Sequence, residues 1–179
     1  PYITADLPGI GGRLKEVPED FVVEEVLPYE ACGEGEHIFV KLQRTGANTA
    51  DVARTIARAM GINGNAVSWA GTKDKWAVVT QTFSFAQPLA VPLGEITARL
   101  EELPCPVLDV KRHRNKLRPG HVRGNRFSIL LRHANDLPAA RTILDQIAAC
   151  GLPNVYGEQR FGRDFANIDR AVDAIRRGR

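Results

Sequence analysis

Apolar positions along the chain follow two periodicities, which predict where strands and helices form. Alternating or continuously apolar stretches are typical of strands. Six segments have this pattern: Phe21–Leu27, His37–Leu42, Ala66–Gly71, Ala77–Phe85, Val107–Lys111 and Phe127–Arg132. The alternation predicts that each strand has one buried face.

Between these segments, apolar residues recur three and four positions apart, as on one face of a helix. Four helices are expected. The first begins near Thr49 and stops at Gly61, the second spans Leu93–Leu103, the third runs from Asp136 or Leu137 to Gly151, and the fourth starts near Asn167. Thr49 can cap the first of them. In the third, we expect Ala140, Leu144 and Ile147 to point inward.

The order of these elements predicts an α+β fold. Strands mostly follow one another in pairs, which favours a mixed, largely antiparallel sheet with helices on one face. The other face of such a sheet would be free for a ligand, as in many RNA-binding domains.

The composition indicates the size of the domain, the class of protein and its cellular compartment. The chain has 179 residues, enough for one domain or one and a fraction, and ordinary shares of hydrophobic (44%) and charged (25%) residues. Its three cysteines show no C-x-x-C spacing, which argues against a disulfide framework or a zinc site and suits the cytoplasm. No apolar run is as long as the roughly 20 residues of a membrane span.

Positive charge is concentrated in one segment although the net charge is only +3. Residues 111–126 hold seven basic side chains and no acidic one: Lys111, Arg112, Arg114, Lys116, Arg118, Arg123 and Arg126. A block of this kind attracts phosphate. It does not distinguish an RNA-binding protein from an enzyme that acts on RNA.

The stretch "WAGTKDKW", residues 69–76, carries the strongest candidate for chemistry. Asp74 follows an expected strand and a Gly-Thr turn. It is either a solvated charge in a turn or a carboxylate nucleophile, which needs no general base because it is ionised at neutral pH. A nucleophile would need a cation beside it, and Lys73 and Lys75 are the neighbours in sequence.

A second candidate is "RGNRF", residues 123–127. Gly124 permits a tight turn, the amide of Asn125 could pair with a base edge, and the ring of Phe127 could stack on a base. Read alone, the stretch favours a hairpin turn with a core Phe. "PEDF" at residues 18–21 indicates only the entry to a strand, and "GIGG" at residues 9–12 lacks the context of a nucleotide loop.

Taken together, six stretches resemble the TruD-type tRNA pseudouridine synthases, in the order of that family. They are "RLKEVPEDFVVEE" (13–25), "GEGEHIFVKL" (33–42), "NTADVA" (48–53), "SWAGTKDKWAVVTQ" (68–81), "HRNKLRPGHVRGNRF" (113–127) and "GLPNVYGEQRFG" (151–162). The most specific are "AGTKDK" and "PNVYGEQRFG".

The resemblance implies roles for five residues. Asp74 matches the family's catalytic aspartate, and Lys15 matches the lysine thought to pair with it, which makes Lys15 a better partner than Lys73 or Lys75. Asn125 and Phe127 match the positions that hold and stack the target uracil, and Phe21 lines the same pocket. The two tryptophans of the motif would then serve packing.

The implied activity is isomerisation of a uridine in tRNA to pseudouridine, with the uracil flipped out of its stack. The resemblance implies no metal and no other cofactor, and tRNA as the partner. The six basic residues from Lys111 to Arg123 would contact the RNA backbone. Whether the carboxylate attacks the base or the sugar, or acts through a deprotonated sugar, stays open, as does the identity of the RNA.

The resemblance also implies that the chain is an N-terminal portion. Family members are about twice as long, with a second domain inserted after the "GEQRFG" region. We expect residues 1–162 to belong to the catalytic domain and residues 163–179 to start the inserted one. The sheet would be completed by a C-terminal segment or a partner chain, and the alternative function is a non-catalytic RNA-binding fragment.

Overall fold

The computed structural model describes residues 3–153, 161–162 and 166–178. It divides into two compact units, residues 12–134 and residues 1–11 with 135–179. The predicted boundary after residue 162 adjoins residues outside the described part. Residues 154–160 of the "GLPNVYGEQRFG" motif lie outside the described part themselves. The two units are therefore described separately.

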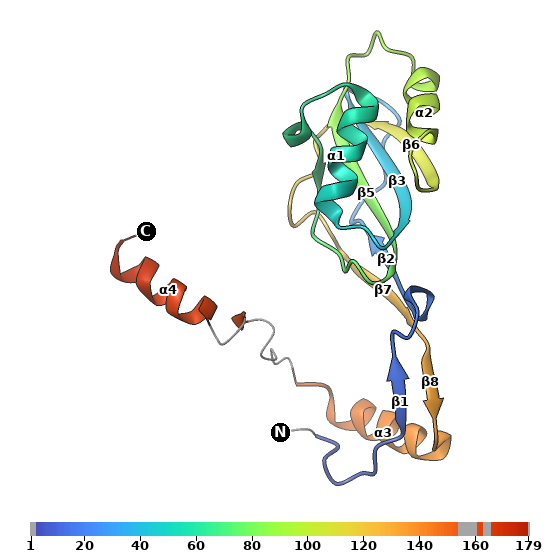
Figure 1. Ribbon diagram of the computed structural model, residues 1–179, viewed down its shortest axis with the longest axis vertical. Helices are drawn as coiled ribbons and strands as arrows, with labels where there is room; N and C mark the ends of the chain where they lie inside the picture. Colours follow the sequence, from blue (N-terminus) through green and yellow to red (C-terminus); the bar gives the residue numbers. More distant parts are fainter. Residues whose placement is uncertain (1–2, 154–160, 163–165, 179) are drawn as a thin grey trace. The chain divides into compact units, whose positions relative to one another are not determined.

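The unit of residues 12–134 is built on a six-stranded sheet (Figure 1). Its strands run in the order β6-β3-β5-β2-β7, with β4 also paired to β5. The bounds are β2 Phe21–Val26, β3 His37–Thr45, β4 Ser68–Trp69, β5 Val78–Ala86, β6 Val107–His113 and β7 Gly124–Ile129. Only the β2–β5 pair is parallel among the pairs described. The α+β, largely antiparallel prediction is confirmed.

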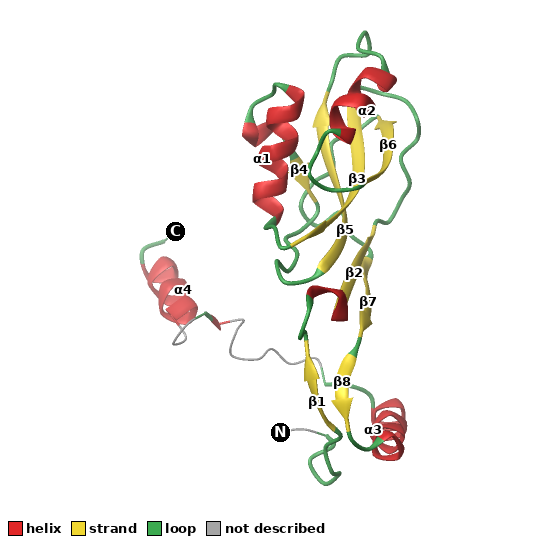
Figure 2. Ribbon diagram, turned by 45° about the vertical axis from the view of Figure 1, so that its right-hand side comes forward, coloured by secondary structure: helices red, strands yellow, loops and turns green. Residues whose placement is uncertain are grey.

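Two helices cover one face of this sheet, α1 (Thr49–Met60) and α2 (Leu93–Glu101) (Figure 2). The core lies between them and the inward side chains of β3 and β5. Its fully buried members include Ile38, Val40, Ile56, Phe83 and Leu100. Alternation along β3 sends Phe39 and Lys41 to the opposite face, as the period of two requires.

Three predicted boundaries differ from the structure. Ala66–Gly71 contributes only the two-residue strand β4, because residues 64–66 form a 3-10 turn (η2, Gly64–Ala66). Phe127–Arg132 is divided between β7 and β8 (Leu131–Ala134). Gly124 begins β7 rather than a tight turn.

Strand β8 pairs with β1 (Gly11–Leu14) in a separate two-stranded ribbon. A short 3-10 turn, η1 (Pro18–Asp20), leads from this region into β2. Asp20 anchors it: its buried carboxylate accepts hydrogen bonds of 2.7–3.0 Å from Arg132 and one of 3.2 Å from the Val17 amide. The "PEDF" entry to β2 is thus fixed to β8.

The second unit holds α3 (Leu137–Cys150) and α4 (Ala166–Arg176). Asp136 caps α3 through a 2.9 Å hydrogen bond from the Ala139 amide, and Gly151 ends it with a φ of 76°, as predicted. The inward-facing residues are not buried, however: Leu144 is 61% exposed and α3 buries no residue. Among the described residues, no helix is long and apolar enough to span a membrane.

Candidate functional site

Asp74 lies in the loop between β4 and β5. Its carboxylate is 43% exposed. One oxygen accepts a 3.0 Å hydrogen bond from the Trp76 amide, and the other is paired with the Lys15 ammonium. The lysine that contacts Asp74 is therefore distant in sequence, and the neighbour Lys73 is paired elsewhere.

The ion pair with Lys15 stabilises the ionised form of Asp74. The hydrogen bond from Lys15 is the largest influence and holds the pKa of Asp74 below its usual range, against a smaller rise caused by burial. Backbone hydrogen bonds from Trp76 and Lys75 lower the pKa further. Asp74 is consequently an anion at neutral pH, as a nucleophile requires.

Lys15 is held in an unusual backbone conformation just after β1. Its φ of 58° lies in the left-handed region, which costs a residue with a Cβ about 1–2 kcal/mol. Such strain persists where surrounding contacts enforce it, often at functional sites. Here the Lys15 Nζ is 3.8 Å from the centre of the Phe21 ring, a cation–π contact, while it pairs with Asp74.

Phe21 and Phe127 continue the site across β2 and β7. Their rings are 5.8 Å apart in an edge-to-face arrangement. Phe127 is 54% exposed although it lies in a strand, so one side of its ring is open to a ligand. Asn125 is two residues before Phe127 on β7, and therefore on the same face of the sheet.

The five residues predicted from the motifs therefore gather in one region, built from segments 13–27, 68–77 and 123–129. The region lies on the helix-bearing face of the sheet, beside α1. We expected the face without helices to be the one left for a ligand. Strands β2 and β7 extend beyond α1 and α2, so these helices leave this part of the face uncovered (Figure 1).

Arg112 does not fit its predicted contact with the RNA backbone. Arg112 is 8% exposed and its guanidinium donates to four carbonyl oxygens, those of Gly35, Gln87, Pro88 and Val91. It is therefore a structural residue of the interior and cannot reach a phosphate. The other five residues predicted to contact the RNA backbone are exposed: Lys111, Arg114, Lys116, Arg118 and Arg123. Two of them are ion-paired, Lys111 with Asp109 and Arg114 with Glu34.

Part of the basic segment adjoins the Asp74 loop. Leu117 is fully buried against Ala70 and Phe39, and the Gly120 amide donates a 2.8 Å hydrogen bond to the Ala70 carbonyl. Lys116 and Arg118 flank this anchor and are exposed. Their charges are thus fixed near the residue that precedes the "GTKD" turn.

The tryptophans of the motif have different environments. Trp69 packs against the core, with its ring 6.2 Å from that of Phe83, as predicted. Trp76 is 52% exposed, so it does not serve core packing. It presents an exposed aromatic surface two residues from Asp74. The sequence pattern does not distinguish it from Trp69, because both tryptophans flank the same short loop.

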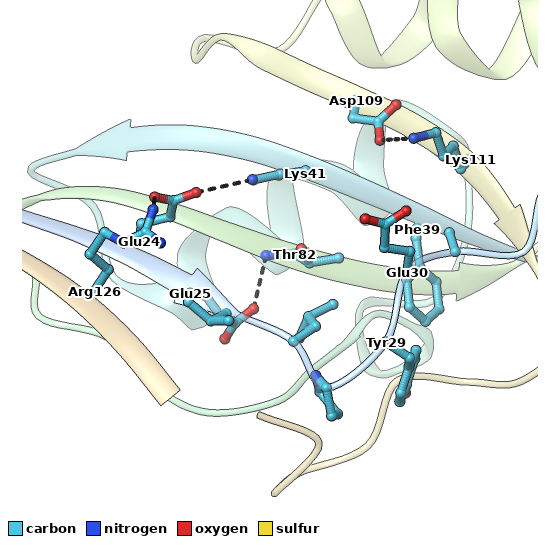
Figure 3. Close-up of a pocket in the computed structure, with 14 residues that line it drawn as sticks. Glu24, Glu25, Tyr29, Glu30, Phe39, Lys41, Thr82, Asp109, Lys111 and Arg126 are labelled. Carbon is cyan, nitrogen blue, oxygen red and sulfur yellow. Dashed lines mark hydrogen bonds and ion pairs between the residues drawn. The ribbon is translucent and has the colours of Figure 1, made fainter. Parts of the chain in front are cut away.

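A hollow with a volume of about 440 Å³ lies on the opposite face of the sheet (Figure 3). The charged side chains around it largely neutralise one another: Glu24 pairs with Lys41 and Arg126, and Asp109 pairs with Lys111. None of the five residues matched to the family's site lines this hollow, so the candidate site lies outside it.

Fold and site together define an α+β domain that presents an ionised carboxylate, a paired lysine and an open aromatic ring beside a basic segment. The family model described as tRNA pseudouridine synthase D (TruD) matches residues 1–175. The chain therefore belongs to the TruD family.

Curated relatives agree with this assignment. The chain is 45% identical over 169 residues to tRNA pseudouridine synthase D of Anaeromyxobacter sp. (strain Fw109-5), covering 94% of this chain and 47% of the relative. It is 46% identical over 165 residues to the Aeromonas hydrophila protein of that name, covering 92% and 46%. The chain thus spans about half the length of these relatives.

A solved structure shares the fold. The crystal structure of a Methanosarcina mazei protein that carries the name TruD matches with a TM-score of 0.75 and 32% identity. The match covers 90% of this chain and 38% of the other.

Proposed function

We propose that this chain carries the catalytic aspartate and the uracil-holding residues of an enzyme that isomerises uridine to pseudouridine in tRNA. The observation that carries the proposal is the Asp74–Lys15 ion pair against Phe21, beside the open ring of Phe127. Membership of the TruD family and the names of its relatives support the substrate. RNA binding and a cytoplasmic location go with this function.

The reaction exchanges one bond of the ribose for another. The bond from N1 of uracil to the ribose carbon breaks, the base rotates, and C5 forms a bond to the same carbon while C5 loses a proton and N1 gains one. No electrons are gained or lost overall. Asp74 would act as the nucleophile, on the base or the sugar, or would remove a proton from the ribose.

Lys15 has a positioning and charge-balancing role in this proposal. Asp74 is 43% exposed and would stay ionised in water at neutral pH even without its partner. Once an RNA covers the site and excludes water, an unpaired carboxylate would be costly. Lys15 keeps the anion paired, and its contact with Phe21 fixes its direction.

The target uracil would stack on Phe127, with its edge toward Asn125. A flipped base loses a few kcal/mol of stacking and pairing, and stacking on an aromatic side chain recovers about 1–3 kcal/mol. Phosphate contacts from Lys116 and Arg118, and from Arg114 and Arg123, would supply the remainder. Residues 1–162 would all belong to the catalytic domain, with residues 163–179 starting the inserted one.

The test is pseudouridine formation on an unmodified tRNA transcript by the 179-residue chain and its Asp74→Asn variant. We expect the variant to lose turnover by at least about 1,000-fold, since the nucleophile is gone, while RNA binding survives. Asp51→Asn is the matched control, because Asp51 is 49% exposed and ion-paired to Arg54. Equal turnover by wild type and Asp74→Asn would refute the role of Asp74.

The alternative is a non-catalytic RNA-binding protein, in which the exposed basic residues between 111 and 126 bind RNA without turnover. It predicts that the folded wild-type chain binds tRNA, with an affinity that falls steeply with salt, and yields no product. Formation of pseudouridine by the chain would exclude it. Replacing Lys116 and Arg118 with Ala should reduce the salt slope by about 1 per lost phosphate contact under either function.

A further inference from the structure

A network of buried polar side chains lies directly beneath the Asp74 loop. Arg44 is 2% exposed, Thr49 1% and Gln81 0%, and they come from β3, α1 and β5. Burying such groups costs free energy unless they are hydrogen-bonded. Their partners are therefore informative, and most of those partners are backbone atoms of residues 71–74.

Arg44 holds the end of the loop at Asp74. One guanidinium nitrogen donates to the Asp74 carbonyl at 3.3 Å and to the Ala47 carbonyl, and the other donates to the Lys73 carbonyl at 3.4 Å and to the Thr49 hydroxyl at 3.0 Å. The forked, always charged guanidinium suits several acceptors at once, which an ammonium cannot match in geometry. Burial lowers the pKa of Arg44 and the Asp74 charge opposes this.

Thr49 has all the hydrogen bonds its hydroxyl can form. The oxygen accepts from Arg44 and, at 3.1 Å, from the Lys73 amide, and the hydroxyl donates to the Gln81 amide oxygen at 3.4 Å. We expected Thr49 to cap α1, but the N-cap is Asn48 and Thr49 is the first helical residue. Its hydroxyl serves the Asp74 loop instead.

The remaining loop contacts come from Gln81 and Glu25. The Gln81 amide nitrogen donates to the Gly71 carbonyl at 2.7 Å. Glu25 forms a 2.7 Å ion pair with Lys73 and accepts a 3.1 Å hydrogen bond from the Thr82 amide. Thus the backbone at residues 71, 73 and 74 and the side chain of Lys73 are all fixed from below.

We infer that Arg44 and Thr49 are positioning residues for Asp74: they fix the backbone of the "GTKD" loop so that its carboxylate meets Lys15. This inference rests on the proposed function for its catalytic consequence. Neither residue lies in the site, and neither belongs to the candidates found in the sequence. They act only through the loop backbone.

Arg112 provides a comparison within the same unit. It is also a buried arginine that donates to four backbone carbonyls, at residues 35, 87, 88 and 91. None of these belongs to the Asp74 loop. Arg44→Lys and Arg112→Lys therefore remove similar bonding and keep the charge, but only the first should affect Asp74.

The first test measures the loop without requiring turnover. In Thr49→Val the Lys73 amide loses its acceptor, and we expect its hydrogen exchange to become at least tenfold faster, while amides of β3 stay protected. Thr49→Ser keeps the hydroxyl and should exchange like the wild type. Thr55→Val, also in α1, removes a hydroxyl that bonds only the Asp51 carbonyl at 3.0 Å and is the matched control.

The second test measures Asp74 itself by carbon-13 NMR titration of its carboxyl group. A loosened loop weakens the Lys15 contact, so the pKa of Asp74 should rise toward its ordinary value in Thr49→Val and Arg44→Lys. It should stay at its wild-type value in Arg112→Lys and Thr55→Val. Where product forms, kcat should fall about 10–100-fold with KM unchanged.

The result that would overturn the inference is an Asp74 pKa and a Lys73 exchange rate that are unchanged in Thr49→Val. Should Arg44→Lys fail to fold, Thr49→Val decides alone, because it conserves shape and removes one hydroxyl. Failure of the proposed function has a different signature, namely turnover that survives Asp74→Asn. The positioning result would then stand as a property of the loop.

Discussion

Helices α1 and α3 have similar sequence patterns and very different surroundings. Both place apolar residues on one face and end at a glycine with positive φ, Gly61 and Gly151. Yet α1 buries six residues, among them Ile56 at 0% exposure, whereas α3 buries none and Leu144 is 61% exposed. Periodicity identifies the apolar face of a helix, but what covers that face depends on the rest of the fold.

The same contrast separates the two units. Residues 12–134 combine a packed core with buried, hydrogen-bonded polar groups such as Asp20 and Thr49. In the other unit, α4 also leaves its apolar face exposed, with Ile175 76% exposed. The candidate site is built wholly from the first unit, where rigid elements can hold it.

The largest expected effect concerns α1, the helix whose apolar face is buried. Ile56→Ala removes a fully buried side chain between α1 and the sheet, and we expect the free energy of unfolding to fall by about 2–5 kcal/mol. Urea denaturation followed by circular dichroism measures this loss. Ile56→Val should lose only about 0.5–1.5 kcal/mol. An equally small loss for Ile56→Ala would mean that the neighbouring side chains move in to fill the cavity.

The next prediction concerns an exposed apolar residue within the well-packed unit. Phe127→Ala should weaken RNA binding by about 1–3 kcal/mol, the contribution of stacking one base, and change stability much less. Ile129→Ala is the matched control, because Ile129 is 51% exposed and lies two residues further along β7 on the same face. Equal effects of the two substitutions on RNA affinity would argue against a stacking role.

Asp20 should make the stability of the fold depend on pH in acid, and not near neutral pH. The hydrogen bond from Arg132 lowers the pKa of Asp20 below its usual value. The ionised carboxylate therefore stabilises the fold above the pKa of the unfolded chain, about 3.9, and this stabilisation is lost as pH falls through the lower, folded value. Asp20→Asn should be less stable than wild type at pH 7, and the difference should shrink in acid.

Urea melts of both proteins at pH 7 and near pH 3 check this prediction. Glu95→Gln is the control, because the Glu95–Arg99 pair lies on an exposed helix surface and should have little effect at either pH. A stability difference between wild type and Asp20→Asn that is constant with pH would show that the ionised state of Asp20 is not what stabilises the entry to β2.

Sequence reasoning succeeded where local pattern decides the structure. It located α1, β2, β3 and β5, and the family resemblance selected Lys15, Phe21, Asp74 and Phe127, which the fold brings together. It failed where tertiary contacts decide. No local feature shows that Arg112 is buried while Arg118 is exposed, or that the Thr49 hydroxyl faces a loop more than 20 residues away.

The smallest expected effect returns to α3. Leu144→Ala removes a side chain that is 61% exposed, so the free energy of unfolding should change by less than about 0.5 kcal/mol, in contrast to Ile56→Ala. The same urea melts measure it. A loss above about 1.5 kcal/mol would show that Leu144 is buried in solution, since only buried apolar side chains cost that much to truncate. The difference between the two helices would then lie in what each one packs against, and not in whether it packs.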